Sequence, residues 1–481
     1  MKTSLFPALI LCAALWALER GDLRTFSDGE EAKTSLTTIQ VDLAGEVVTA
    51  RFRVPDHPAI GYAYAGIQVA LGSAEGMRSL GFQWRRSAEA PAPKQLTLRT
   101  RDGKRLKLDL APYGAPGPAW TAVGISFDDF GLSPFDASNL SSASFTLASH
   151  TVKDAIPLQE GTVEFRRLAW SAAPVPGRVS RPEFASLLGK KKALPPGHGA
   201  WIYDPSEAHV ARLRAYNQSH PVPIRHLFVY AGSISWGADG KAALSALKGE
   251  RLAWFQGRLP GMQIWANIDA LDAKKLGAQP WAEQERLARE IAAAVDGLEA
   301  AAGAHFDVEP YDGAQFPFYV AMKRLSSKPV SAAFGSWDFP VLQVVDLPVL
   351  MAYDLAKAPK AYGEAFARLA RPFIADCAAA GTTGLLGLPF AAAMMEYEYR
   401  EHRTSGAREK APYVMEDFLS AALAVFDGDP GMRRSPGYAG VSVWALPTEG
   451  KKGIGPPRSE WGYYPNTLKE GCLDLLERFS R

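Results

Sequence analysis

The sequence predicts a multidomain protein, in which a β-sandwich precedes an α/β domain of the (β/α)8 TIM-barrel type. Two observations lead to this prediction. Short strands bounded by turn signals fill residues 36–170, whereas from Gly199 short apolar runs alternate with amphipathic helical stretches. The predicted boundaries are a signal peptide at 1–20, the sandwich at 30–172, a linker at 173–198 and the barrel at 199–481.

The clearest sandwich element is a hairpin between Leu96 and Leu110. Leucines occupy every second position on both sides of Asp102-Gly103, and this dipeptide supplies the positive φ angles that a tight turn needs. The alternation indicates that one face of the hairpin is buried and the other is solvated. Further strands are predicted at 39–43, 47–54, 67–71, 80–84, 119–127, 144–148 and 162–169.

The segment between the two domains is rich in proline and contains Lys190-Lys191-Lys192. Proline removes backbone hydrogen-bond donors, and charged side chains normally stay solvated, so we expect a linker with a wet surface.

The C-terminal half contains eight short apolar runs, with helical candidates such as 281–302 and 360–379 between most of them. Continuous apolar strands flanked by helices indicate a parallel sheet that is buried on both sides, and eight such units fit a barrel. A doubly wound open sheet is the alternative, but no glycine-rich phosphate loop follows the first strand. The runs are 200–203, 226–230, 263–266, 305–308, 330–334, 349–353, 384–388 and 441–444.

Composition narrows the function only slightly. Apolar residues make up 47% of the 481 residues and the net charge is +2, so no bulk electrostatic feature predicts a nucleic-acid partner. The chain has 12 Trp and 16 Tyr residues. Aromatic rings stack on the C–H faces of sugars, but they also fill large cores, so composition alone does not choose between these uses.

The N-terminus predicts export. An apolar run from Leu5 to Leu18 follows Lys2 and ends at Glu19-Arg20. This run is shorter than the roughly 20 residues that span a bilayer, so it indicates a secretory signal peptide, with an uncleaved anchor as the alternative. We expect a secreted or periplasmic protein without a membrane span in its mature form.

The three cysteines exclude a disulfide-built scaffold. Cys12 would leave with the signal peptide, and Cys377 and Cys472 form either one bridge or two free thiols. No cysteine pair has metal-ligand spacing and the eight histidines are scattered, so the sequence predicts no metal site and no cofactor.

The strongest chemical motif is Asp307-Val308-Glu309-Pro310 at the end of the fourth barrel strand. Residues i and i+2 of a strand face the same way, so both carboxylates can point into one site. The charge of one raises the pKa of the other, and a carboxylic acid kept neutral near pH 7 can protonate a glycosidic oxygen. Salt-bridged strand-end residues are the competing interpretation.

Two segments of the sequence resemble known families. Residues 120–130 and 161–165 resemble galactose-binding-like jelly rolls such as family 11 carbohydrate-binding modules. That resemblance implies a sugar-binding role, through Tyr62, Tyr64 or Trp84, although each of these aromatics also suits a core position.

The order of motifs in the barrel resembles the family 18 glycoside hydrolases, which are chitinase-like barrels. In that family Asp-x-Glu ends strand four, Met-x-Tyr-Asp ends strand six and Trp ends strand eight. Here the matching residues are Asp307 and Glu309, Met351-Ala352-Tyr353-Asp354, and Trp444.

By this resemblance Glu309 would be the general acid/base, and Asp307 would orient the 2-acetamido group of the substrate. Tyr353 would donate a hydrogen bond to the acetamido oxygen, with Asp354 beside it, and Trp444 would form the floor under the sugar. The acetamido oxygen then attacks the anomeric carbon, so that the protein supplies no nucleophile. The resemblance thus implies retaining hydrolysis of a polysaccharide of 2-acetamido sugars.

The sequence departs from the family pattern at two places. Ala302 and His305 replace two aspartates of strand four, although an inward His305 can hydrogen-bond Asp307. On strand three, Trp265-Ala266-Asn267-Ile268-Asp269 replaces the usual Ser-x-Gly-Gly. The candidate substrate-binding residues are Tyr203, Trp265, Asn267, His305 and Trp444.

Other functions remain open. One alternative pairs Glu309 with Asp354 or Asp269 in a conventional mechanism on a sugar that lacks the acetamido group. Another is a barrel that binds polysaccharide without cleaving it. A metal-dependent deacetylase is disfavoured because no Asp/His ligand cluster is visible in the sequence.

Overall fold

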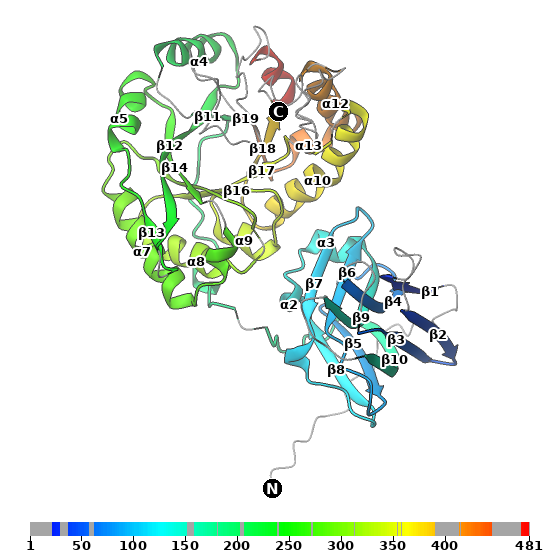
Figure 1. Cartoon of the computed structure of the whole chain (residues 1–481). Helices are drawn as coiled ribbons and strands as arrows, with labels where there is room; N and C mark the ends of the chain where they lie inside the picture. The colour runs from blue at the N-terminus through cyan, green and yellow to red at the C-terminus, as the bar shows by residue number, and fades with distance from the viewer. Residues whose placement is uncertain are drawn as a thin grey trace, which may run out of the picture. The chain divides into compact units, whose positions relative to one another are not determined.

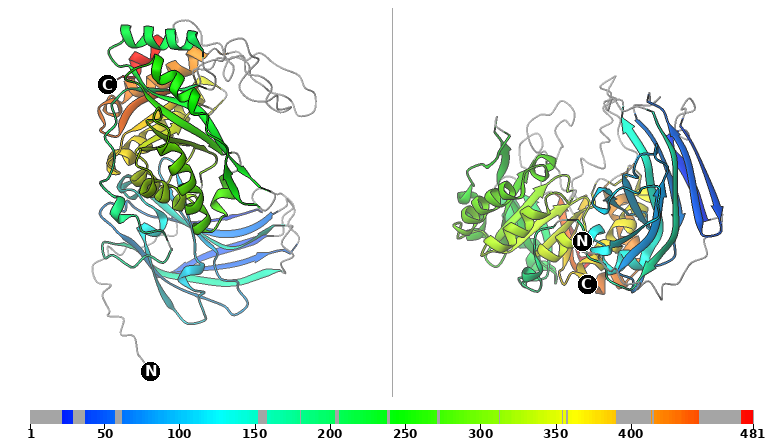
Figure 2. Two further views of the ribbon diagram at one scale, coloured as in Figure 1. Left: turned by 90° about the vertical axis from the view of Figure 1, so that its left-hand side faces the viewer. Right: turned by 90° about the horizontal axis from the view of Figure 1, so that it is seen from below.

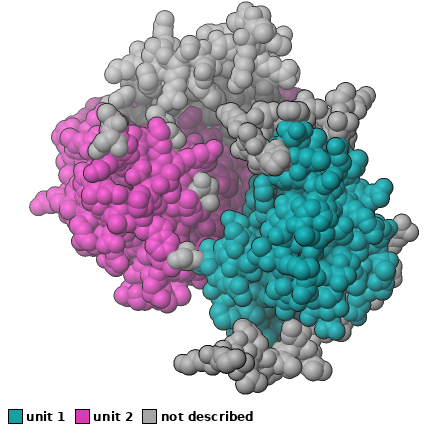
Figure 3. Space-filling view, turned by 60° about the horizontal axis from the view of Figure 1, so that its bottom comes forward, with its two compact units in different colours: residues 1–180 teal, residues 181–481 magenta. Residues whose placement is uncertain are grey.

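The computed structural model describes residues 22–28, 37–56, 62–151, 158–179, 181–202, 206–237, 240–270, 273–311, 313–353, 355–356, 358–389, 413, 415–444 and 473–480. The chain forms two compact units, residues 1–180 and 181–481 (Figure 3). The division falls inside the predicted linker. The predicted signal peptide, Tyr203, Asp354 and Cys472 lie outside the described residues, and Cys377 is a buried free thiol.

Unit 1 is a sandwich of two antiparallel five-stranded sheets, which confirms the predicted fold class (Figures 1 and 2). One sheet has the order β1(Leu23–Ser27), β4(Tyr62–Ala70), β9(Leu140–Thr151), β6(Gln95–Thr100), β7(Arg105–Asp109). The other has the order β2(Thr38–Ala44), β3(Val47–Val54), β10(Gln159–Ser171), β5(Ser79–Arg86), β8(Thr121–Ser126). Two short helices, α2(Phe127–Phe130) and α3(Pro134–Asn139), follow β8.

The sandwich core follows the predicted alternation. Strands β6 and β7 pair across Asp102-Gly103, where Gly103 has a φ of 94°, so the predicted hairpin is confirmed. Trp84 lies in the core with 1% of its surface exposed, and its ring packs edge-on against Phe82. The suggestion that Trp84 contacts sugar is therefore corrected, because its ring is covered by protein.

Unit 2 is a closed barrel of eight parallel strands, which confirms the second part of the fold class (Figure 1). Closure is direct, because β11 pairs with both β12 and β19. A short strand, β13(Ala242–Leu244), pairs antiparallel with the extended end of β12 and was not predicted. The barrel strands are β11(His198–Ile202), β12(Ile224–Trp236), β14(Gln263–Ala270), β15(Gly303–Val308), β16(Val330–Phe334), β17(Leu347–Met351), β18(Gly384–Pro389) and β19(Tyr438–Trp444).

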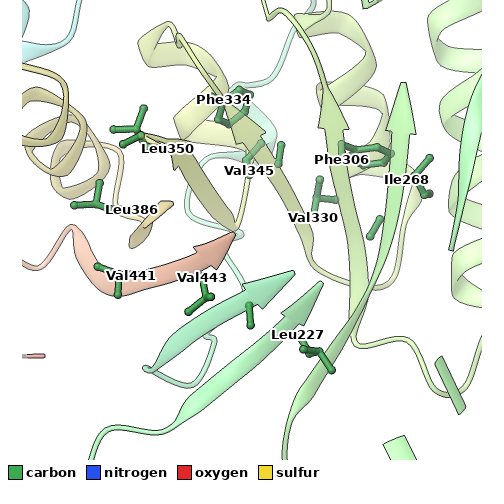
Figure 4. Close-up of a cluster of buried hydrophobic side chains, with 14 of the residues drawn as sticks. Leu227, Ile268, Phe306, Val330, Phe334, Val345, Leu350, Leu386, Val441 and Val443 are labelled. Carbon is green, nitrogen blue, oxygen red and sulfur yellow. The ribbon is translucent and has the colours of Figure 1, made fainter. Parts of the chain in front are cut away.

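Helices surround the barrel and bury its outward-facing residues. Phe306, Ile268 and Leu350 belong to this apolar outer layer, which is drawn in Figure 4. The helices are α4(Glu207–Ser219), α5(Gly249–Arg258), α6(Ala273–Gly277), α7(Trp281–Asp296), α8(Phe316–Leu325), α9(Phe339–Val344), α10(Pro359–Ala379), α12(Met415–Gly428) and α13(Gly431–Arg434). Within the described part of the chain, no helix is both long enough and apolar enough to cross a membrane.

Part of the predicted linker is packed against the barrel. Leu187 lies in the apolar outer layer, and Leu194 packs against a cluster of buried barrel residues that includes Trp201 and Phe228. The ammonium group of Lys191 donates hydrogen bonds to the carbonyl oxygens of Leu342, at 2.5 Å, and of Val345. Burial lowers the pKa of Lys191 to about 7. Lys191 is therefore a structural residue, and the expectation that all three lysines are solvated is wrong for it.

Candidate active site

The interior faces of β14 and β15 place four polar side chains side by side. On β15, Ala304 and Phe306 point outward into the layer under the helices, so the alternating residues His305 and Asp307 point inward. The strand register pairs Asn267 with His305 and Asp269 with Asp307. Because the strands are parallel, Asp269 and Asp307 lie together at their C-terminal ends, which is where barrel enzymes collect function.

Three carboxyl groups gather at this end of the barrel. Burial raises the pKa of Asp307 well above its ordinary value, and the charges of Asp269 and Glu309 raise it further. Its Oδ1 atom is buried and has no hydrogen-bond partner among the described residues. Glu309 follows directly after β15 with an exposed side chain, yet surrounding protein still desolvates its carboxyl group enough to raise its pKa. The site therefore favours neutral carboxylic acids over carboxylates.

Asn267 holds Asp269 in place. Its side-chain amide donates a hydrogen bond to Oδ1 of Asp269 at 2.9 Å. Burial raises the pKa of Asp269 to about 7; the hydrogen bond from Asn267 lowers it and the charge of Glu309 raises it. Asn267 was predicted as a substrate contact, but it is 99% covered and its amide group is directed to Asp269, so we reassign it as a support for that carboxyl group.

His305 is a neutral interior residue. Its Nδ1 atom lies 2.8 Å from the hydroxyl of Ser331, and that hydroxyl donates to the carbonyl of Leu347, so Nδ1 carries the proton. Burial lowers the pKa of His305 to about 3. The ring packs against Phe228 at a centroid distance of 4.0 Å. His305 thus bonds Ser331 rather than Asp307, and it has no exposed surface for substrate.

Tyr353 and Trp444 form an aromatic wall on the opposite strands. Trp444 is the last residue of β19, and Tyr353 follows two residues after the end of β17. Their rings stack with centroids 4.8 Å apart and planes 16° apart. Both side chains are partly exposed, so two predicted site residues from separate motifs meet at the same end of the barrel as the carboxyl groups.

Trp265 does not reach this end of the barrel. It is fully buried, and its indole N–H donates to Nδ1 of His226 at 3.2 Å. We correct its assignment from substrate contact to core residue, because no part of its ring is accessible.

Asp269 is the residue that the sequence interpretation undervalued. The sequence indicates it only as an alternative partner of Glu309. The available signal was its position two residues after Asn267, which places both side chains on the same face of the strand, but the pairing with Asp307 depends on strand register, which local sequence does not specify.

Among the described residues, no group of three or more His, Cys, Asp or Glu side chains is arranged to hold a metal ion.

No protein-family model matches the sequence, and no curated protein matches it either. Several solved structures match parts of this one. A chitinase from Bacteroides thetaiotaomicron is 15% identical, and the match covers 52% of this chain and 89% of the chitinase with a TM-score of 0.38. An endo-1,4-β-D-mannanase from Thermotoga petrophila is 12% identical, and the match covers 59% of this chain and 98% of the mannanase with a TM-score of 0.38. A family 11 carbohydrate-binding module of the cellulase Lic26A-Cel5E of Clostridium thermocellum is 11% identical, and the match covers 34% of this chain and 98% of the module with a TM-score of 0.24.

Proposed function

We propose that the protein is a glycoside hydrolase that cleaves a polysaccharide, with Glu309 as the general acid/base. The observation that carries this proposal is the cluster of Glu309, Asp307 and Asp269 at the C-terminal mouth of the barrel, where desolvation favours protonated carboxyl groups. A carboxylic acid that stays protonated near neutral pH can donate its proton to a glycosidic oxygen. The stacked rings of Tyr353 and Trp444 supply an apolar surface for a sugar ring.

We propose further that hydrolysis is substrate-assisted and acts on 2-acetamido sugars. Asp307 and Glu309 belong to one strand end and approach a sugar from one side. A conventional retaining pair instead needs carboxyl groups on opposite faces of the sugar, about 5–5.5 Å apart. In the substrate-assisted reaction the acetamido oxygen forms the bond to the anomeric carbon while Glu309 protonates the leaving oxygen. The carboxylate of Asp307 then accepts a hydrogen bond from the acetamido N–H and stabilises the positive charge that develops on that group.

The conventional mechanism remains the second candidate because Asp269 also lies beside the site. The decisive experiment treats the purified protein with a panel of acetylated and non-acetylated polysaccharides and reads the products by mass spectrometry. Inhibition by a thiazoline, which mimics the cyclic intermediate, supports substrate assistance. A glycosyl-enzyme adduct on Asp269 or Asp354 supports the conventional pair, and no turnover on any polysaccharide supports a barrel that only binds.

We also propose that the sandwich binds a glycan on the outer face of the sheet that contains β4, β9 and β6. Tyr62, which is 40% exposed, stacks on Tyr64 with a centroid distance of 5.8 Å. The strand register places these rings on the same face as a hollow of about 710 Å³ lined in part by Gln95, Asp109 and Thr146. Aromatic rings beside polar groups suit a sugar, which presents both C–H faces and hydroxyls.

The proposed polysaccharide substrate is a polymer that the protein would meet outside the cytoplasm. We therefore propose export by the N-terminal signal peptide to the periplasm or medium, which N-terminal sequencing of the protein from its native host would test.

A further inference from the structure

Asp269 and Asp307 are neighbours whose geometry is fixed by the fold. Paired positions on adjacent parallel strands lie about 5 Å apart and point to the same face of the sheet. The carboxyl group of Asp269 is oriented by the amide of Asn267 at 2.9 Å. Oδ1 of Asp307 is buried without a hydrogen-bond partner in the described part of the chain. Two carboxyl groups in this arrangement cannot both ionise at low cost.

The groups around this pair do not offset a double negative charge. Glu309 lies beyond the end of β15 and adds a third carboxyl group, and the charge of Asp307 helps to raise the pKa of Tyr319 on α8. His305 is neutral and bonded to Ser331. No described lysine or arginine contributes to the pKa of either aspartate. A proton is therefore the positive charge available to the pair.

We propose that Asp269 and Asp307 hold one proton between them, and that Asp269 takes it when Asp307 meets the substrate as a carboxylate. The proton leaves the O–H group of Asp307 and bonds to a carboxylate oxygen of Asp269, so the net charge of the pair does not change. Asp269 is a positioning residue in this scheme because it acts through Asp307. The consequence for catalysis rests on the proposed function, whereas the shared proton does not.

The shared proton is tested by titration, without any substrate. Carboxyl groups of ¹³C-labelled aspartate are followed by NMR across pH 3–9 in the full chain and in Asp269→Asn. We expect one signal of the wild type to titrate near neutral pH, as two coupled groups do. In Asp269→Asn that signal is lost, and Asp307 titrates at a lower pH because the new amide donates to it. Asp427→Asn, which changes a surface aspartate of the same unit, leaves the near-neutral signal in place. A wild type without such a signal, or an Asp307 signal that titrates at the same pH in Asp269→Asn as in the wild type, contradicts the shared proton.

The role in catalysis is tested by comparing Asp269→Asn with Asp269→Ala. At pH 5–6 a neutral amide resembles the protonated Asp269, so Asp269→Asn keeps kcat within about tenfold of the wild type. Asp269→Ala offers the Asp307 carboxylate no hydrogen-bond donor in place of protonated Asp269, and so lowers kcat by about 10²–10³. Equal loss in both variants, with folded proteins, contradicts the positioning role. If the wild type cleaves no polysaccharide, the proposed function fails while the NMR titration still decides the shared proton.

Discussion

The outward-facing and inward-facing side chains of the same barrel strands differ in polarity and in their effect on stability. Phe306 on β15 points outward into the apolar layer beneath the helices (Figure 4), whereas the next residue, Asp307, points inward, and its buried Oδ1 atom has no hydrogen-bond partner among the described residues. Buried Oδ1 of Asn267 and Nε2 of His305 also have no such partner. Burying apolar surface stabilises a fold, and burying unsatisfied polar atoms destabilises it. One strand thus presents apolar side chains on its outer face and buried polar atoms without hydrogen-bond partners on its inner face.

Phe306→Ala should produce the largest change in stability. Removing a fully buried phenylalanine from the outer layer typically costs about 3–5 kcal/mol of the free energy of unfolding. Chemical denaturation of the full chain, followed by the fluorescence of the barrel tryptophans, measures this loss. A loss below about 1 kcal/mol would show that the outer layer repacks easily and is not the stabilising side of β15.

Tyr353→Phe should change activity more than stability. Its hydroxyl is proposed to bind the acetamido oxygen, and losing one hydrogen bond that tightens in the transition state costs about 10²–10³ in rate. The variant should therefore slow hydrolysis of an N-acetylated substrate and leave one without the acetamido group nearly unchanged. Equal losses on both substrates, together with a lower melting temperature, would make Tyr353 a purely structural residue.

Asp307→Asn should stabilise the protein, in contrast to Phe306→Ala on the opposite face. The pKa of Asp307 is raised by folding, so its contribution to stability is complete below the unfolded value and is lost as pH rises through the folded value. An amide cannot ionise, so the variant should gain about 1–3 kcal/mol near pH 8 and little near pH 4. Unfolding measured at both pH values tests this, and a variant that is less stable than the wild type at pH 8 would contradict it.

Tyr62→Ala should have the smallest effect, because it changes one ring of the sandwich surface. A stacking contact contributes about 0.5–1.5 kcal/mol, so binding of the full chain to an insoluble polysaccharide should weaken roughly two- to tenfold. Trp281→Ala, which removes an exposed ring of unit 2, serves as the control. If the two variants bind alike, Tyr62 is not part of a glycan-binding face.

The sequence predicted the fold from features that are local. The Asp102-Gly103 turn and the eight apolar runs each depend on a few adjacent residues, and each appears in the structure at the expected place. Strand β1, which was not predicted, depends on distant pairing with β4. The burial of Lys191 likewise depends on the carbonyls of Leu342 and Val345, far along the chain.

The site was harder to predict than the fold. Hydrophobic periodicity predicts which face of a strand a residue occupies, but not how far the residue lies from the open end of the barrel. Trp265 and Asp269 share the inward face of β14, yet only Asp269 lies near the open end, and Trp265 is sealed in the core. The motif Asp307-x-Glu309 was found because both residues belong to one strand. The pairing of Asp269 with Asp307 was not predicted, because it joins two strands and the register between strands is a tertiary property.

Glu309 is proposed to donate the proton that breaks the glycosidic bond. The most direct test of this proposal compares turnover of the wild type, Glu309→Gln and Glu299→Gln on the polysaccharide that the panel identifies. Glu299→Gln makes the same chemical change at an exposed position before β15. We predict that Glu309→Gln lowers turnover by about 10²–10⁴ while the fold and sugar binding persist, and that Glu299→Gln behaves as the wild type. Turnover by Glu309→Gln at the wild-type rate would contradict the account.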